Sequence, residues 1–417
     1  MKILLINKFH YNRGGSETYY FAQAEALKAK GHEVVFFAME DEKNIPCEQS
    51  KYFVPNVDYN NEGGVKSKIK AVSSFFYNKT AAERMEQLIK DEHPDIAHVG
   101  LLHRQITFSV VEVLKKHGIP VVMTMHDLIF ACPNYTMLTH GEICEKCLTG
   151  SVINCIKNKC VKDSTSKSIL AACEKKYLIS KKYYDLIDLY ITECNQYHEL
   201  MDKSQVTTSR IVTKTNFLPI KQEYSFNKEY KDYILYFGRF SKEKGILTLL
   251  KAHKASNCKH RLIVVGAGPI KDEILAYVEE NKLTNIELPG PIYGKDMEKI
   301  IEGAKTIIVP SEWYENCPYA LLQSLAKGKV VIASRIGGLP ELIEDGKTGF
   351  LFEAGNADDL VKKIEYVFSM NKEEYEWMSE KISKEAYEKH NWEQYAEFLI
   401  EEYKKLIIEK QNGQMTS

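Results

Sequence analysis

In this 417-residue sequence, the residues best suited to chemistry are two acids and two amides between positions 312 and 323. Glu312, Glu315 and Asn316 come just before a predicted helix, and Gln323 lies about one turn inside it. The first N–H groups of a helix lack partners, and with the macrodipole they bind anions such as phosphate. Because a phosphate would repel a carboxylate, Glu315 is better suited to accept hydrogen bonds from hydroxyl groups. A nucleotide sugar carries both kinds of group.

Two cations, Arg239 and Lys244, follow another predicted strand at 233–237. They flank a turn that Gly238 and Gly245 make possible. Arginine presents a fork that binds phosphate through two hydrogen bonds, and lysine adds a point charge. This spacing predicts a clamp for a diphosphate.

A strand–helix–strand unit over residues 306–352 must position these groups. The apolar run 307–309 shows no polar alternation, which is typical of a parallel strand covered on both faces. A helix is predicted between Pro318 and Gly328, and a second buried strand at 330–333. Such a unit opens its helix at the carboxyl edge of the sheet, where ligands bind in open α/β folds.

The run PSEWYENCPYALLQSLAKGKVVIAS, followed by GGLPELIEDGKTGFLF, resembles family four of the retaining glycosyltransferases. That family has the α/β GT-B fold, in which two Rossmann-like domains face each other across a cleft. Its motif is a glutamate, seven residues and a second glutamate; Glu315 matches the first, and Gln323 replaces the second. The resemblance implies that Glu315 binds donor-sugar hydroxyls. It also implies that Gln323 holds the ribose by a neutral hydrogen bond, roughly half as strong as a charge-assisted one.

The resemblance further implies transfer of a hexose from a nucleotide-diphosphate sugar to a hydroxyl acceptor, with retention, in cell-surface polysaccharide or glycolipid synthesis. Arg239 and Lys244 match the family's cations that stabilise the departing diphosphate, so no catalytic metal is required. The amides of Asn316 and Cys317 would hold phosphate, and the base would lie against backbone near Ile292. The acceptor would be a saccharide or a lipid-linked saccharide.

Some interpretations stay open. Glu341 is either a ribose or sugar contact or the first acid of its own helix. Because Gln323 departs from the motif, the chain is alternatively a non-catalytic, sugar-nucleotide-binding partner subunit. A nicotinamide-dependent oxidoreductase is poorly supported, since GAGP at 266–269 lacks the spacing and final glycine of GxGxxG.

The first part of the chain opens as a strand, a glycine loop and a helix. Gly14 and Gly15 precede Ser16, a good N-cap, and either form a tight turn or, as the resemblance implies, face the donor. His126 follows the predicted strand at 121–124; it is either structural or, by resemblance, a contact of the donor hexose near the reaction centre.

Two further segments are candidates for acceptor contacts. His103 and Arg104 follow a predicted strand and could line the acceptor side. Residues 56–80 interleave lysines with aromatic residues, which suits either an acceptor or an anionic membrane surface, or alternatively a solvated helix with an apolar face.

Composition limits the classes of function. The 56 basic and 57 acidic residues nearly cancel, so no nucleic-acid partner is indicated. No apolar run approaches the roughly 18 residues that would span a bilayer. We expect a cytoplasmic protein that could be peripheral to the inner membrane face.

Seven of the ten cysteines lie between residues 132 and 194. Cys144 and Cys147 are separated by two residues, and Cys155 and Cys160 by four, which matches the spacing of tetrathiolate zinc sites. We therefore expect these four to hold a structural zinc ion. Free buried cysteines are the alternative, and an iron–sulfur cluster would lack a redox role here.

The sequence predicts three parts. Residues 1–218 form the acceptor-side Rossmann-like domain, with the cysteine-rich insert at about 132–165. After a linker around 217–230, residues 230–390 form the nucleotide-sugar domain. Residues 391–417 form a helix that, by resemblance, crosses back to the first domain, and a tail.

Overall fold

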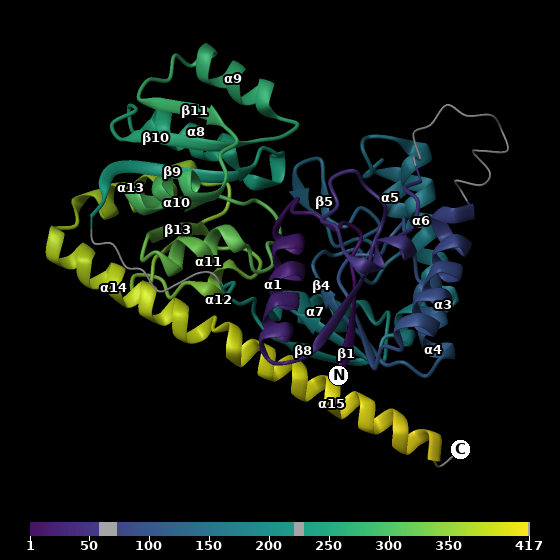
Figure 1. The fold of residues 1–417 in the computed structure, drawn as a ribbon. Helices are drawn as coiled ribbons and strands as arrows, with labels where there is room; N and C mark the ends of the chain where they lie inside the picture. The colour runs from purple at the N-terminus through teal and green to yellow at the C-terminus, as the bar shows by residue number, and fades with distance from the viewer. Residues whose placement is uncertain (58–72, 221–228, 416–417) are drawn as a thin grey trace. The chain divides into compact units, whose positions relative to one another are not determined.

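The computed structural model describes residues 1–57, 73–220 and 229–415, with side chains described as far as residue 412. The chain divides into two compact units (Figure 1). The first comprises residues 1–139, 144–215 and 392–417, and the second comprises residues 140–143 and 216–391.

A six-stranded sheet with every described pairing parallel forms the centre of the first unit. Its strand order is β2-β1-β3-β4-β7-β8. The strands are β1 (Lys2–Ile6), β2 (Glu33–Phe37), β3 (Ile96–Val99), β4 (Val121–Met125), β7 (Leu189–Thr192) and β8 (Arg210–Thr213). The helices are α1 (Gly15–Ala29), α3 (Lys79–Glu92), α4 (Ser109–Lys116), α5 (Ile153–Lys157), α6 (Thr165–Ser180), α7 (Asn195–Ser204) and α15 (Trp392–Met415), with short 3₁₀ helices η1 (Glu48–Tyr52) and η2 (Tyr183–Leu186) and strand β5 (Leu138–Thr139).

The second unit has its own parallel sheet, in the order β11-β10-β9-β12-β13-β14. The strands are β9 (Lys231–Arg239), β10 (Arg261–Ala267), β11 (Ile286–Gly290), β12 (Ala304–Val309), β13 (Val330–Ser334) and β14 (Phe350–Phe352). The remaining elements are β6 (Glu142–Ile143), η3 (Lys242–Lys244), α8 (Ile246–Ala255), α9 (Lys271–Glu280), α10 (Gly294–Gly303), α11 (Tyr319–Ala326), α12 (Leu339–Leu342), α13 (Ala357–Ser369) and α14 (Lys372–Lys389).

Both sheets follow from continuous apolar runs. The strands β4 and β13 are buried along their whole length, as expected for parallel strands with helices on both faces. The predicted α/β class is therefore confirmed. In each sheet the strand order reverses once, between β1 and β3 in the first unit and between β9 and β12 in the second. Ligands of open α/β sheets bind at the carboxyl ends of strands next to such a switch point.

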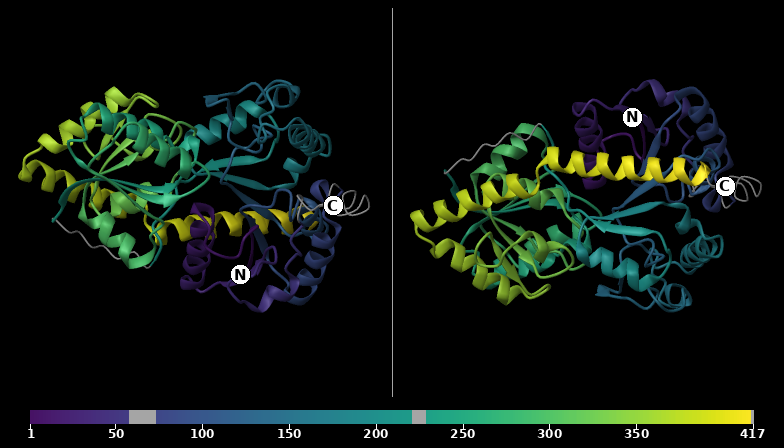
Figure 2. Two further views of the ribbon diagram at one scale, coloured as in Figure 1. Left: turned by 90° about the horizontal axis from the view of Figure 1, so that it is seen from above. Right: turned by 90° about the horizontal axis from the view of Figure 1, so that it is seen from below.

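Helix α15 is part of the first unit, where it packs beside α1 (Figures 1 and 2). The Tyr19 and Tyr395 hydroxyls share a hydrogen bond of 2.9 Å, and Gln23 Nε2 donates to the Tyr403 hydroxyl at 3.1 Å. Helix α15 continues to Met415. None of the helices in the described ranges is both long and apolar enough to cross a bilayer.

Candidate active site

The polar residues of the second unit gather where β9 and β12 end, at the switch point of its sheet. Arg239 is the last residue of β9, and Lys244 closes the short helix η3 that follows. Gly245 has φ +65°, and a Cβ there would lie 1.8 Å from the Pro310 carbonyl oxygen. The turn after β9 can therefore pack against the end of β12 only because residue 245 is glycine.

Lys244 and Glu315 form an ion pair at this edge. Lys244 Nζ donates to Glu315 Oε1 at 2.6 Å, and the Ser311 hydroxyl donates to the same oxygen at 2.5 Å. The Glu315 side chain is 6% exposed. Burial alone would raise the pKa of this carboxyl, but the Lys244 ammonium and the hydrogen bonds outweigh burial and lower the pKa. Glu315 is thus an ionised acceptor held in a fixed orientation.

The backbone of Glu315 is fixed by the loop after β13. Gly338 N donates to the Glu315 carbonyl oxygen at 2.7 Å. Gly337 has φ +58°, and a Cβ there would come within 2.4 Å of the same oxygen. Glycine at position 337 therefore lets the loop backbone approach the backbone of Glu315 closely.

The side chains of Arg239 and Gln323, unlike those of Lys244 and Glu315, are not paired with another residue that the structure describes. Arg239 is exposed and Gln323 is half-buried, and neither side chain has a hydrogen-bond or ion-pair partner among the described residues. Gln323 lies on α11, whose N-cap is Pro318. Both side chains are therefore available to a ligand.

The other predicted donor contacts are spread over the second unit. Asn316 and Cys317 are buried just before α11, and Asn216 Nδ2 donates to the Cys317 carbonyl oxygen at 2.9 Å. Ile292 is half-buried after β11, and Glu341 is exposed on α12. Glu312, singled out with Glu315, accepts a hydrogen bond from the Thr248 hydroxyl.

In the first unit, His126 lies directly after β4 and contacts Glu193, which lies directly after β7. His126 Nδ1 is 2.8 Å from Glu193 Oε1, and both side chains are at most 6% exposed. Burial lowers the pKa of His126, but the Glu193 carboxylate more than offsets burial, so the net pKa is raised. A carboxylate at Nδ1 leaves Nε2 as the nitrogen available to a substrate.

Gly100 lies beside His126 Nε2 and Asn7. A Cβ on Gly100, just after β3, would lie 3.5 Å from Nε2 and 2.9 Å from Asn7 Oδ1. Asn7 itself follows β1, and its Oδ1 accepts from Leu101 N at 3.0 Å. The sequence reading did not identify Asn7, Gly100 or Glu193. All three directly follow strands, so the rule that singled out His126 could have found them.

The N-cap of helix α1 is not the residue that the sequence predicted. Gly14 is the N-cap and Gly15 the first helical residue, so Ser16 is not the N-cap. The Ser16 hydroxyl donates instead to Glu17 Oε1 at 3.0 Å. Both glycines are exposed.

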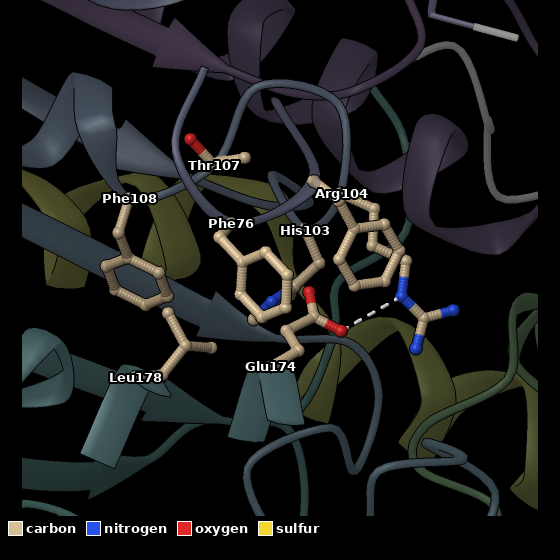
Figure 3. A pocket seen from close by; sticks show the side chains of 8 residues that line it. Phe76, His103, Arg104, Thr107, Phe108, Glu174 and Leu178 are labelled. Atoms are coloured by element: carbon tan, nitrogen blue, oxygen red, sulfur yellow. Dashed lines mark hydrogen bonds and ion pairs between the residues drawn. The ribbon is translucent and has the colours of Figure 1, made fainter. Parts of the chain in front are cut away.

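His103 and Arg104 line a cavity of about 10 Å³, together with Phe75, Phe76, Thr107, Phe108, Glu174 and Leu178. Figure 3 shows Arg104 turned to Glu174, and its Nε donates to Glu174 Oε2 at 3.1 Å. Burial and the nearby cations lower the pKa of His103 to about 3, so its imidazole is neutral. This cavity could hold one water molecule but no saccharide. The central lysines of the 56–80 segment lie outside the described residues.

The cysteines predicted to bind zinc form no disulfide bonds. Cys147 and Cys155 are buried, while Cys144 and Cys160 are partly exposed. In the described part of the chain, no group of three or more His, Cys, Asp or Glu side chains is arranged to hold a metal ion. The zinc site at Cys144, Cys147, Cys155 and Cys160 stays a prediction, which metal analysis of purified protein would test.

Two family models match the chain. The model described as "Glycosyl transferases group 1" matches residues 219–389, and the model described as "Glycosyltransferase Family 4" matches residues 13–142.

Among the curated relatives, an uncharacterized glycosyltransferase of Methanocaldococcus jannaschii is 31% identical over 174 residues. That match is 42% of this chain and 48% of the relative, so the chain spans about half of the relative's length. The N-acetyl-alpha-D-glucosaminyl L-malate synthase of Bacillus anthracis is 22% identical over 96% of this chain and 97% of its own.

A solved structure supports the fold. The HepE protein of Anabaena, in complex with UDP, superposes with a TM-score of 0.67, covering 97% of this chain and 100% of its own at 15% identity. The predicted GT-B architecture of two Rossmann-like domains is thereby confirmed. The chain belongs to the group 1, family 4 glycosyltransferases.

Proposed function

We propose that the chain transfers a sugar from a nucleoside diphosphate sugar to a hydroxyl acceptor, with retention at the anomeric carbon. The observation that carries the proposal is the arrangement at the β9–β12 edge. An unpartnered guanidinium on Arg239 lies on the same edge as the Lys244–Glu315 pair, at the switch point of a parallel sheet. Cations for a diphosphate and a carboxylate for hydroxyls are the groups that such a donor requires.

In this proposal the bound donor separates the Lys244–Glu315 ion pair, because its diphosphate and its sugar each bind one of the two side chains. Lys244 turns to the diphosphate beside Arg239, and Glu315 accepts hydrogen bonds from sugar hydroxyls. As the bond to the sugar breaks, negative charge grows on the leaving diphosphate, and the two cations stabilise it. Fixed donors aimed at developing charge contribute about 3–4 kcal/mol each. The chain supplies these charges itself, so the proposed reaction needs no catalytic metal.

The acceptor is proposed to bind to the first unit, at the strand edge where His126 Nε2 lies beside Gly100. The Glu193 carboxylate raises the pKa of His126, which favours the protonated imidazole, a stronger hydrogen-bond donor to a hydroxyl group than the neutral ring. Cell-surface polysaccharides or glycolipids are the proposed products, with a saccharide or lipid-linked saccharide as acceptor.

The test begins with binding. Titration calorimetry with UDP, ADP, GDP and their glucose conjugates should give saturable binding for one base; UDP comes first because the Anabaena protein was solved with UDP. Incubation with the matching donor should then release sugar slowly or transfer it, and NMR of the product should show a retained anomeric configuration. If every nucleotide fails to bind to folded protein, the proposal is wrong.

A non-catalytic partner subunit is the second candidate, and Gln323 favours it. The glutamine offers a neutral acceptor where the family motif has a carboxylate. Donor binding without transfer or hydrolysis, together with activity gained in Gln323→Glu, would favour this candidate.

A further inference from the structure

Lys8 occupies a position in the first unit that corresponds to a ligand site in open α/β sheets. It lies two residues after β1, which borders the switch point between β1 and β3. The side chain is half-buried, and its ammonium makes no hydrogen bond or ion pair with any of the described residues. A partly desolvated cation without a counter-charge is costly, so such groups are usually paired.

Two guanidinium groups lie in the same region. Arg13 shares one aromatic ring with Lys8: its Cζ is 4.2 Å, and Lys8 Nζ 5.2 Å, from the Phe9 centroid. Arg104 is close enough to influence Lys8 electrostatically. Arg104 also has φ +70°, a left-handed conformation that non-glycine residues rarely adopt and that often marks ligand sites.

Two nearby carboxylates, Glu174 and Asp127, offset only part of the charge of these three cations. Glu174 is already paired with Arg104 at 3.1 Å, and Asp127 Oδ1 accepts from Ile129 N at 3.1 Å. Burial and the repulsion from Arg104 and Arg13 together lower the pKa of Lys8 to about 8, despite both acids. Lys8 is still mostly protonated at pH 7, so an excess of positive charge persists.

We propose that Lys8, Arg13 and Arg104 bind a negatively charged group of the acceptor, a phosphate or a carboxylate, beside His126. The inference rests on the proposed function, because it assigns the acceptor to this edge of the first unit. It adds that the acceptor is an anionic saccharide. Charge-assisted hydrogen bonds from lysine and arginine would hold the anion and orient a nearby hydroxyl group.

The test is titration calorimetry with glucose 1-phosphate, glucuronate and glucose, each added to full-length protein in excess UDP so that phosphate cannot enter the donor site. Glucose should bind at least about tenfold more weakly than one of the two anionic sugars. Lys8→Met should weaken binding of that anion at least about tenfold, and Lys8→Arg should largely retain it. The two anionic probes separate a phosphate site from a carboxylate site.

Lys43→Met is the matched control, because Lys43 is an exposed loop lysine whose ammonium lies 5.8 Å from the Tyr11 ring centroid. It should leave both anion and UDP binding unchanged. Equal binding of all three sugars, no binding of either anion, or anion binding unaffected by Lys8→Met would overturn the inference while UDP binding still supports the proposed function. Lys8-dependent anion binding without any nucleotide binding would remove the proposed function and leave an anion site.

Discussion

The ammonium of Lys244 lies 2.6 Å from a carboxylate oxygen of Glu315, although 71 positions separate the two residues in the sequence. The strands that bring them together, β9 and β12, are neighbours in the sheet. Without a donor, each group therefore satisfies the other's charge. A nucleoside diphosphate sugar would offer each a new partner, because its phosphates are anionic and its hydroxyls donate.

Lys244→Ala should reduce turnover at least about a hundredfold, because one of the two cations for the leaving diphosphate is lost. The substitution also leaves Glu315 buried without its counter-charge, which typically costs about 3–5 kcal/mol in unfolding free energy. Steady-state kinetics and urea unfolding should be measured together. Lys242→Ala is the control: its side chain is 74% exposed and its acidic partner lies 3.9 Å away, so neither quantity should change. Near wild-type turnover of Lys244→Ala would remove Lys244 from the clamp.

Glu193→Gln should lower the free energy of unfolding, because protonated His126 would lose the carboxylate that stabilises its charge. The folded pKa of His126 is raised above its unfolded value, so the stabilisation is fully present below about pH 6.5 and is lost as pH rises through the folded pKa. The free energy of unfolding of the wild type should therefore exceed that of the variant by about 1–3 kcal/mol at pH 6 and by less at pH 9.

Urea unfolding at both pH values checks this difference, and NMR titration of the His126 ring checks its cause. Glu199→Gln, an exposed substitution on α7, provides the control and should show no such dependence. A difference that is the same at both pH values would mean that Glu193 acts through packing alone.

The sequence predicted most strands of both sheets because parallel strands are buried on both faces and appear as unbroken apolar runs. The β13 run VVIAS is an example, predicted at 330–333 and observed at Val330–Ser334. Strand β8 was missed, since it is an edge strand whose residues are at most half-buried. The family motif marked Glu315 and Gln323, yet nothing in the sequence indicated that Lys244 would be the partner of Glu315.

Contacts between residues that are far apart in the sequence explain why the sequence did not single out Glu193 and Lys8. Glu193 has no motif of its own, and its importance depends on β4 and β7 being neighbours, which places its carboxylate beside His126. The unpaired state of Lys8 likewise depends on where Arg104 and Glu174 lie. Sequence position identifies strand ends, whereas strand order, which long-range packing sets, decides which ends meet.

Gly245→Ala should destabilise the second unit more than a positive φ alone explains. A left-handed conformation costs a non-glycine residue about 1–2 kcal/mol, and here the new Cβ would also overlap the Pro310 carbonyl oxygen at 1.8 Å. The turn would have to move away from β12, which would displace Lys244 from Glu315.

Gly346→Ala separates the two effects, because Gly346 has φ +80° but no atom within 4 Å of its Cβ position. Gly346→Ala should lose only the roughly 1–2 kcal/mol that a left-handed conformation costs, and it should bind nucleotide as the wild type does. Thermal unfolding and UDP titration of both variants measure the difference. Equal losses would show that the contact with Pro310 relaxes at no cost.

Gln323→Glu should tighten nucleotide binding about fivefold, because a charged acceptor makes a stronger hydrogen bond to the ribose hydroxyls than an amide does. Gln323 is half-buried on α11 and its side chain has no hydrogen-bond partner among the described residues, so the substitution breaks no side-chain hydrogen bond. Gln323→Met, which keeps the length of the side chain but removes the acceptor, should weaken binding. Calorimetric titration of the three proteins with the same nucleotide gives the comparison. If Gln323→Glu binds no more tightly and Gln323→Met binds as well as the wild type, residue 323 does not contact the ribose, and its departure from the family motif no longer favours an inactive subunit.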